Sequence, residues 1–546
     1  MSYFRTSLFL AVGCAFAVGL SSVQAQSSCE VQGLTSVDEA IGDQFGTSVS
    51  IGGDFAVVGA RYGDTDEPDT GAAYVFQRIG LSWGQVAKLT ASDGASGDWF
   101  GSSAVIKDDI IVVGAPLADT AGGARAGRVY VFERPVSGWE DMTETSKLTA
   151  SDGVAEDWFG APVAVSGNFA IIGAHRNDEA GSESGAAYIF KRDCETNNCT
   201  WTEFQKLTAS DAEGGEAFGA PVSIDGDFAI VGAWNAHGTG DAYVFQYLNS
   251  SWSEVFKLKD ALEPGDLEPG DEFGFGVSLH GDVAIVSANR DNLDGFTDAG
   301  SAYVFERSNS TWTKVAHLTA SNPVHSAEFG NGAVWIGDNM AVVGAARNGV
   351  VAGSAYVFKR PDSGWSDMTE TTELTVSDPI ERDRFGNSVS GNDGIVIVGA
   401  ALDDKLGPDA GAVYVFAVAG DCNENEAVDA CEILIDPSLD QNESGILDEC
   451  EDLDGDGVPD DEDNCPDSDL GAVVVIDECE TGVENQFLED GCTMADTVMQ
   501  CSEGVGNHGA FVRCVAHLTN FWKCQGLIAG DEKGAIQSCA GQADIP

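Results

Sequence analysis

The sequence predicts an all-β fold: a seven-bladed β-propeller with four strands per blade, followed by an acidic segment and a small helical, Cys-rich unit. Three observations predict it. A Phe-Gly pair recurs at intervals of 55 to 59 residues, the repeats contain four strand-sized runs, and residues 420–512, directly after the repeats, contain no Lys or Arg. The phenylalanines of the seven pairs are Phe45, Phe100, Phe159, Phe218, Phe273, Phe329 and Phe385.

The first repeat shows the pattern that the others follow. Residues 48–51 alternate between polar and apolar, a Gly-Asp turn follows, and residues 55–60 form an apolar run that ends in Gly-Ala. Tyr74-Val75-Phe76 and a segment beginning at Trp83 complete the unit. Short runs of β-branched and aromatic residues between Gly and Asp are typical of strands. Four strands repeated seven times predict blades that pack face to face around an axis.

The ends of the repeat region predict how the ring closes. The seventh repeat stops at Phe416 without a Trp segment, whereas residues 33–38 precede the first Phe-Gly as residues 88–93 precede the second. We therefore expect the N-terminal strand to complete the last blade. Such closure removes an exposed sheet edge.

These repeats resemble FG-GAP repeats, the units of the integrin α-subunit propeller, in a bacterial-type version that ends in Trp and Lys-Leu-Thr-Ala-Ser-Asp. The resemblance covers all seven units and implies a propeller over residues 29–418. Integrin-type units carry an Asp-rich calcium loop between the Phe-Gly strand and Gly-Ala. Here that place holds only a tight turn, as at residues 51–54, so calcium is not expected in the propeller.

The loops after Gly-Ala are acidic in several repeats, and we expect them to project from one rim. They are either partner-binding loops or ordinary solvated surface loops. Their acidic residues are Asp64, Asp66, Glu67 and Asp69 in the first repeat, Asp291, Asp294 and Asp298 in the fifth, and Asp403, Asp404 and Asp409 in the seventh.

The overall charge excludes some partners. The chain has 89 acidic and 27 basic residues, a formal charge of −62, and residues 420–512 contain no Lys or Arg. Without a basic patch to neutralise phosphates, nucleic acid and anionic membranes are not expected partners. A segment such as 420–512 either stays disordered or folds around cations.

Residues 420–466 predict a calcium-binding stalk, because oxygen-bearing side chains recur at positions 1, 3, 5, 9 and 12 of three windows, with a carbonyl at position 7. The first window comprises Asp421, Asn423, Asn425, Ala427, Asp429 and Glu432; the second Asp440, Asn442, Ser444, Ile446, Asp448 and Glu451; the third Asp452, Asp454, Asp456, Val458, Asp460 and Asp463. Gly445 and Gly457 occupy the turn of the second and third windows, and Glu426 that of the first. The third window, with Asn464-Cys465-Pro466 after it, resembles a thrombospondin type 3 repeat. An acidic disordered linker is the alternative.

The N-terminus predicts export. Arg5 precedes an apolar run over residues 8–20, and residues 23–25 offer a small-residue cleavage site, so we expect a signal peptide over 1–25 and a secreted or cell-surface/periplasmic protein. Export favours disulfides. Cys194 and Cys199 flank a turn and predict a local bridge. We expect Cys422, Cys431, Cys450 and Cys465 to pair among themselves. Removal of the signal peptide would leave 13 of the 14 Cys, and this odd number leaves one thiol free or paired between chains.

Residues 467–546 predict a small helical, disulfide-stapled unit. Apolar residues have helical spacing over 511–522, and residues 492–501 and 533–539 also favour short helices. The unit resembles the region that follows thrombospondin type 3 repeats in some secreted bacterial proteins. His508 and His517 are either structural or metal ligands together with Cys.

The function that these features favour is a secreted, calcium-binding adhesion or interaction protein with an extracellular protein or glycan ligand. No membrane span is expected, and no catalytic residues are assigned. The seven histidines are scattered and no Gly-x-Ser-x-Gly occurs. Two alternatives remain open: an extracellular hydrolase of polymers with an active site on the rim, and a structural envelope or surface protein.

Overall fold

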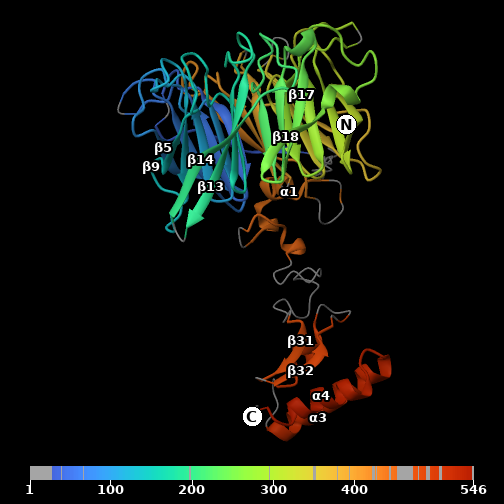
Figure 1. The fold of residues 1–546 in the computed structure, drawn as a ribbon. Coiled ribbons are helices and arrows are strands. Elements are labelled where there is room, and N and C mark those ends of the chain that lie inside the picture. The colour runs from blue at the N-terminus through green and yellow to red at the C-terminus, as the bar shows by residue number, and fades with distance from the viewer. Residues whose placement is uncertain are drawn as a thin grey trace, which may run out of the picture.

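A computed structural model describes residues 28–543 apart from 39, 66, 196–197, 294, 348–351, 378, 381, 393, 421–424, 426, 442–443, 452–470, 478, 487, 489–491 and 503–506. Seven four- or five-stranded antiparallel sheets form a ring of blades, which confirms the predicted seven-bladed propeller (Figure 1). The predicted signal peptide lies outside the described residues.

Each blade begins at its inner strand and ends at its outer one. Blade 1 holds β2 (Phe45–Gly52), β3 (Phe55–Ala60), β4 (Ala72–Ile79) and β5 (Ser82–Thr90); blade 2 holds β6 (Ser103–Lys107), β7 (Ile110–Ala115), β8 (Arg128–Glu133) and β10 (Ser146–Leu148); blade 3 holds β11 (Val163–Ser166), β12 (Phe169–Ala174), β13 (Ala186–Glu195) and β14 (Asn198–Leu207); blade 4 holds β15 (Val222–Asp225), β16 (Phe228–Ala233), β17 (Asp241–Leu248) and β18 (Ser251–Lys257). Blade 5 holds β19 (Phe273–His280), β20 (Val283–Ala288), β21 (Ser301–Ser308) and β22 (Thr311–Thr319); blade 6 holds β23 (Val334–Ile336), β24 (Met340–Ala345), β25 (Ser354–Lys359) and β27 (Thr372–Leu374); blade 7 holds β28 (Phe385–Asn392), β29 (Ile395–Ala400) and β30 (Ala412–Ala417). The short helices η1 (Ala236–Gly238) and η2 (Leu258–Ala261) lie in the loops of blade 4.

The N-terminal strand closes the ring, as predicted. β1 (Cys29–Leu34) pairs antiparallel with β30, so that Leu34 lies opposite Val413 and blade 7 has the order β1-β30-β29-β28. The two ends of the propeller are therefore held in one sheet, in which β1 covers the edge of β30.

Two repeats depart from the predicted four-strand pattern. In the second repeat, β9 (Met142–Thr143) pairs in parallel with β5 of blade 1, and β10 then completes blade 2. In the sixth repeat, β26 (Met368–Thr369) pairs in parallel with β22 of blade 5, and β27 then completes blade 6. Pro135 and Pro361 stand where the other repeats continue a hairpin. A proline has no N–H for the strand ladder, so the outer strand is interrupted and its first part is left to pair with the neighbouring blade.

Aromatic residues fill the space between blades. Phe45 lies 5.6 Å from Tyr74 and 6.0 Å from Phe76 between ring centroids, and all three are buried with Trp83 against blade 7. Burial of each such side chain contributes about 2–3 kcal/mol. Near the axis the blades approach too closely for side chains: a Cβ on Gly59 would lie 1.9 Å from the Gly101 carbonyl oxygen. These glycines fix the spacing of the inner strands.

The segment after the propeller is bridged to it, which corrects the predicted cysteine pairing. Cys431, in α1 (Asp429–Ile435), forms a disulfide with Cys29 of β1 rather than with another stalk cysteine. The reason is that Cys29 pairs with Ala417 at the point where the chain leaves β30. The short helices η3 (Pro437–Leu439) and η4 (Asp448–Cys450) follow α1.

The C-terminal unit contains the predicted helices α2 (Met494–Gln500), α3 (His508–Gln525) and α4 (Gly530–Ala540). A hairpin of β31 (Val473–Ile476) and β32 (Cys479–Glu484), which was not predicted, packs with them in one core. Disulfides Cys479–Cys539 and Cys501–Cys514 lie within the unit, and the predicted Cys194–Cys199 bridge joins β13 to β14. Among the described cysteines, Cys524 is free and exposed, in line with the odd count.

Candidate binding face and calcium loops

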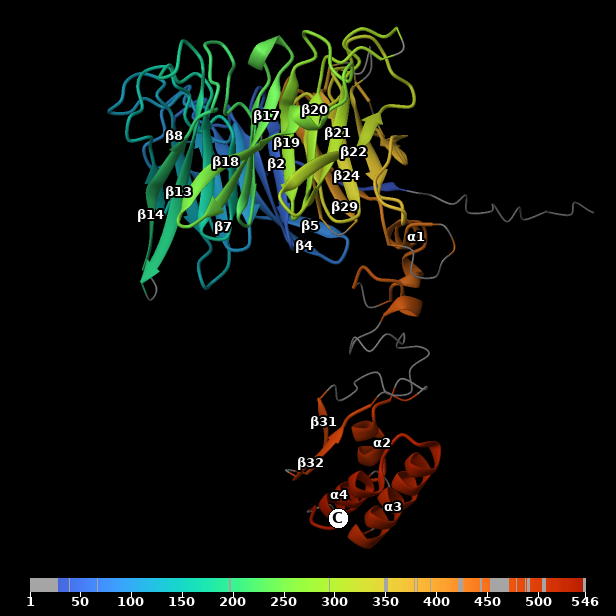
Figure 2. The same cartoon turned by 45° about the vertical axis from the view of Figure 1, so that its right-hand side comes forward.

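The ring has two different faces. The loops after Gly-Ala lie on one face, as predicted, whereas the turns between the first two strands of each blade and helix α1 lie on the other (Figure 2). We call these the loop face and the stalk face.

The acidic residues of the loop face mostly stabilise their own loops. The Asp64 carboxylate accepts a hydrogen bond from the Asp69 N–H at 3.0 Å, and Asp404 accepts one from the Asp409 N–H at 2.8 Å. Asp403 is buried and accepts the Tyr414 hydroxyl at 2.6 Å. Asp66 and Asp294 lie outside the described residues. The contacts favour the interpretation of ordinary surface loops over that of partner-binding carboxylates.

The Lys and Asp of the Lys-Leu-Thr-Ala-Ser-Asp motif meet between neighbouring blades. Asp152 accepts hydrogen bonds from the Tyr188 hydroxyl at 2.8 Å and from Lys206 Nζ at 2.7 Å. Burial alone would raise the pKa of Asp152, but the contact with Lys206 reverses this, and the pKa lies below its usual value. The motif is therefore accounted for by packing between blades.

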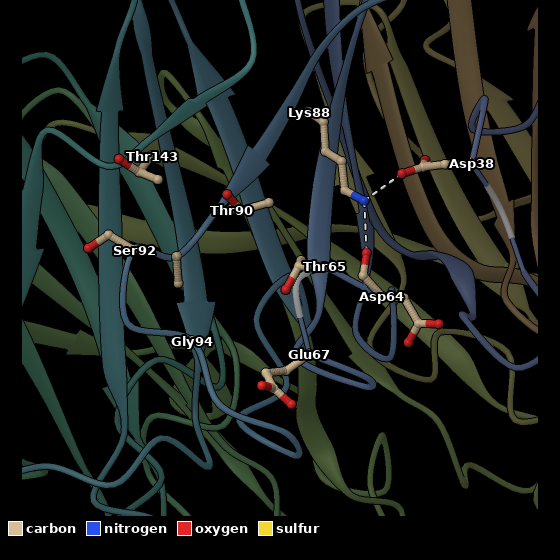
Figure 3. A pocket seen from close by; sticks show the side chains of 10 residues that line it. Asp38, Asp64, Thr65, Glu67, Lys88, Thr90, Ser92, Gly94 and Thr143 are labelled. Atoms are coloured by element: carbon tan, nitrogen blue, oxygen red, sulfur yellow. Dashed lines mark hydrogen bonds and ion pairs between the residues drawn. The ribbon is translucent and has the colours of Figure 1, made fainter.

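A cavity of about 570 Å³ on the loop face is built from the same motif (Figure 3). Lys88 Nζ lies 2.5 Å from an Asp38 carboxylate oxygen and donates to the Asp64 carbonyl oxygen at 2.8 Å. Thr65 and Glu67 line the side toward the loop. Lys88 is thus already paired with Asp38 and holds the loop at Asp64.

The residue before each Phe-Gly pair forms a ring that the sequence analysis missed. All seven of these residues have a left-handed backbone, with φ between 51° and 61°. They are Gln44, Trp99, Trp158, Ala217, Glu272, Glu328 and Arg384. The left-handed conformation costs a non-glycine residue about 1 kcal/mol or more, and glycine would avoid this cost. We call these residues the mouth ring, because they precede the inner strands on the loop face.

Most mouth-ring residues contact the residue that follows Gly-Ala, or the next one, in their own blade. The pairs are Gln44 Oε1 with Arg61 Nε at 2.8 Å, the Trp158 ring with the Arg176 guanidinium at 4.0 Å, Glu272 with Arg290 at 3.1 Å, and Glu328 with Arg347 at 2.6 Å. The chemistry of the ring therefore changes around its circumference. Blades 5 and 6 have Glu–Arg ion pairs, blades 2 and 3 have aromatic groups, and blades 7 and 1 have arginines with no ion-pair partner among the described residues.

A buried acid precedes the mouth ring in most repeats. Asp43 is 3 % exposed and accepts a hydrogen bond from the Ala40 N–H at 2.8 Å. Burial, more than the neighbouring acids Asp64 and Asp38, raises the pKa of Asp43 to about 6. These acids hold the turn that enters the inner strand.

The turn on the stalk face is short in blade 1. The turn between β2 and β3 contains only Gly53 and Asp54, and the Asp54 carboxylate pairs with Arg78 at 3.0 Å. Two cavities of about 590 and 390 Å³ open on this face, and Trp335 and His280 line both.

The second predicted calcium loop is described at most of its positions. Asp440 is 7 % exposed, and its two oxygens accept the N–H groups of Ser444 at 2.9 Å and Gly445 at 2.8 Å. Ser444 Oγ, position 5, lies 2.6 Å from Glu451 Oε1, position 12. Asp448, position 9, begins η4 and accepts hydrogen bonds from Gln441.

The first loop brings together the same two positions. Asn425 Nδ2, position 5, donates to Glu432 Oε1, position 12, at 2.9 Å. Asp429, position 9, begins α1, as Asp448 begins η4. Ala427, whose carbonyl was predicted as a ligand, donates its own N–H to Asn425 Oδ1 at 2.8 Å.

The other predicted ligands cannot be placed. Asp421, Asn423 and Asn442 lie outside the described residues, as does the whole third loop with Asp452, Asp454, Asp456, Val458, Asp460 and Asp463. Among the residues that the structure does describe, no three His, Cys, Asp or Glu side chains are grouped so that they could hold a metal ion. Calcium binding by the loops therefore stays a prediction.

The repeats identify the family. The FG-GAP repeat matches residues 29–76, 83–132, 142–190, 201–245, 252–305, 312–358 and 368–416, which together exceed half of the chain. The chain belongs to the FG-GAP repeat family. No curated protein matches the FG-GAP chain in sequence.

Solved structures similar to this FG-GAP protein share little sequence with it. The periplasmic gluconolactonase PpgL of Pseudomonas aeruginosa is 15 % identical with a TM-score of 0.40, covering 64 % of this chain and 88 % of that one. Chaetomium thermophilum Sqt1, bound to the N-terminus of ribosomal protein L10, is 16 % identical with a TM-score of 0.38, covering 67 % and 86 %. A putative 6-phosphogluconolactonase from Bacteroides fragilis is 14 % identical with a TM-score of 0.38, covering 64 % and 83 %. These values support no inference about activity.

Disulfides and FG-GAP repeats together indicate an extracellular or periplasmic protein. No helix in the described part of the chain has the length and apolar character needed to cross a bilayer.

The second stalk loop lies directly against the FG-GAP propeller. Gly445 has φ +87°, and a Cβ built on it would lie 2.9 Å from the carbonyl carbon of Gly80, in the hairpin between β4 and β5. Only glycine allows this approach. The shape of the loop is thus coupled to blade 1.

Proposed function

We propose that this protein is a secreted, calcium-binding interaction protein that uses the loop face of its propeller as a binding platform. The observation that carries the proposal is the mouth ring. Seven non-glycine residues keep a costly left-handed backbone on one face, while their side chains differ from blade to blade. Strain of this kind is concentrated at functional sites, and a fixed backbone with variable side chains suits recognition.

The stalk loops support the calcium part of the proposal. In both partly described loops positions 5 and 12 lie within hydrogen-bond distance, and position 9 begins a helical turn. Calcium favours several oxygen ligands in flexible geometry. Bound there, the ion would neutralise carboxylates in a segment that has no Lys or Arg, and so stabilise the stalk against blade 1.

Binding of the full mature chain to extracellular polysaccharides, matrix proteins and cells tests the proposal. Binding should be lost in EDTA and restored by Ca²⁺ but not by Mg²⁺, which requires a stricter octahedral geometry. Binding to none of these surfaces, or binding that a chelator leaves unchanged, contradicts it.

A further inference from the structure

Two arginines of the loop face, Arg61 and Arg384, have no counter-ion among the residues that the structure describes. Arg61 donates from Nε to Gln44 Oε1, and the described residues place no carboxylate within ion-pair distance of Arg61 or of Arg384. Arg384 belongs to blade 7 and is exposed; Arg61 belongs to blade 1 and is partly buried. Burial, followed by the nearby positive charge of Arg384, lowers the pKa of Arg61. In a chain of charge −62, these two cations therefore have no ion-pair partner within the described part of the structure.

Blades 5 and 6 show how the same position is neutralised elsewhere. Glu272 pairs with Arg290 and Glu328 pairs with Arg347, each acid being a mouth-ring residue of the same blade as its arginine. In blade 1 the mouth-ring residue is Gln44, which has the shape of Glu and can accept a hydrogen bond but carries no charge. The Gln44–Arg61 pair thus keeps a hydrogen bond between the two side chains but lacks the negative charge of Glu272 and Glu328. This is the arrangement expected where a ligand supplies the negative charge.

Aromatic rings extend from this cationic pair across two further blades. The Arg61 guanidinium lies 5.2 Å from the ring centroids of both Tyr62 and Trp99. Trp99 lies 6.0 Å from Tyr62 and 6.3 Å from Trp158. Arg176 covers Trp158 at 4.0 Å, with Glu183 3.9 Å away. The three partly exposed rings are edge to face with one another, at interplanar angles of 79° and 67°; the Arg61 guanidinium contacts the first two rings, and the Arg176 guanidinium covers the third.

We infer that Arg61, Arg384 and the row formed by Tyr62, Trp99 and Trp158 bind an acidic polysaccharide whose sugar rings carry carboxylates. This inference rests on the proposed role of the loop face as the binding platform. The carboxylates supply the charge that Gln44 lacks, by accepting charge-assisted hydrogen bonds from the guanidinium groups. The sugar rings lie along the aromatic row. An acidic peptide would satisfy the arginines but leave these rings uncovered, so the polysaccharide fits more of the surface.

Calorimetric binding of short oligogalacturonates to the full mature chain tests the inference, with neutral cello-oligosaccharides and polyglutamate as comparison ligands. The informative variant is Gln44→Glu, which supplies Arg61 with the counter-ion that Arg290 already has. This variant should weaken oligogalacturonate binding about tenfold or more, because the new glutamate would accept the hydrogen bonds that Arg61 otherwise donates to the ligand carboxylate. Arg61→Gln should have a similar effect. Arg78→Gln makes the same charge change on the stalk face, where Arg78 pairs with Asp54, and should leave the affinity unchanged.

Several results would overturn the inference. They are wild-type protein that does not bind oligogalacturonate, neutral oligosaccharide or polyglutamate that binds as tightly, or a Gln44→Glu variant that unfolds at the wild-type temperature and binds with wild-type affinity. Calcium-sensitive binding to matrix that is insensitive to Gln44→Glu would refute this site while leaving the proposed function intact. A wild-type protein that binds neither oligogalacturonate nor any of the polysaccharides, matrix proteins and cells tested would refute both this site and the proposed function.

Discussion

The indole ring of Trp335 packs against the backbone of Gly391 on the stalk face: a Cβ built on Gly391 would lie 2.8 Å from Trp335 Cε3. Other pairs of inner strands have a different contact at this place. Ser50 Oγ, for example, accepts the Ile106 N–H of the next blade at 3.2 Å. Trp335 of blade 6 stands where blade 1 has Ser50, and Gly391 of blade 7 stands where blade 2 has Ile106. The large residue and the glycine therefore compensate each other.

Gly391→Ile should therefore destabilise the propeller by about 1–3 kcal/mol, the usual cost of overpacking a buried contact. The double variant Trp335→Ser/Gly391→Ile restores the contact of the other blades and should recover most of the loss. Urea unfolding of the two single variants and the double variant measures the coupling. Additive effects in this cycle would show that the two residues are independent.

The Cys29–Cys431 disulfide should contribute more to stability than the Cys194–Cys199 bridge. It joins residues 402 apart in sequence, whereas the second bridge joins residues 5 apart at the end of a hairpin. Removing a bridge that closes a long loop typically costs about 2–4 kcal/mol. Thermal unfolding of Cys29→Ser/Cys431→Ser should show a clear loss, with Cys194→Ser/Cys199→Ser as the matched control. Equal losses in the two variants would disprove this ranking.

The buried acids before the mouth ring should make stability fall as the pH rises. The Asp43 carboxyl titrates near 3.8 when unfolded and near 6 when folded. Between these values the folded state holds the extra proton, so the free energy of unfolding decreases with increasing pH. Asp271, whose pKa burial also raises to about 6, should act in the same direction.

Asp43→Asn removes this titration and keeps an oxygen that can accept the Ala40 N–H. The stability of the variant relative to wild type should therefore increase from pH 4 to pH 7. Melting temperatures of both proteins across this range provide the measurement. A constant difference between the two curves would mean that Asp43 does not titrate in this window.

The propeller could be predicted from sequence because every repeat contributes the same evidence. Phe45 and the glycine after it recur in every repeat. The N-terminal segment around Leu34 matches the strand that the seventh repeat lacks, and only a closed ring brings these two ends together. The Cys29–Cys431 bridge could not be predicted in this way. It depends on where the stalk meets the ring, and no repeat encodes that contact.

The sequence analysis missed the mouth ring because it looked for residues that recur in every repeat, and the mouth-ring residues do not recur. The Phe-Gly pair is constant, while the residue before it changes from Gln44 to Trp99 to Arg384. Its left-handed backbone has no sequence signature, since glycine never occurs there. The calcium loops were predicted from oxygen spacing and, for the third loop, from a resemblance to a thrombospondin type 3 repeat. In the second loop two predicted ligands, Ser444 and Glu451, lie within hydrogen-bond distance, and calcium binding stays a prediction.

Counting calcium by native mass spectrometry after gel filtration tests the central claim most directly. The wild type should retain about two or three ions, because three loops offer oxygen ligands at suitable spacing. Asp440→Asn/Glu451→Gln should lose the ion of the second loop, and EDTA should make the stalk sensitive to protease. A chain that carries no calcium, with a stalk equally protease-resistant in EDTA, would contradict the account.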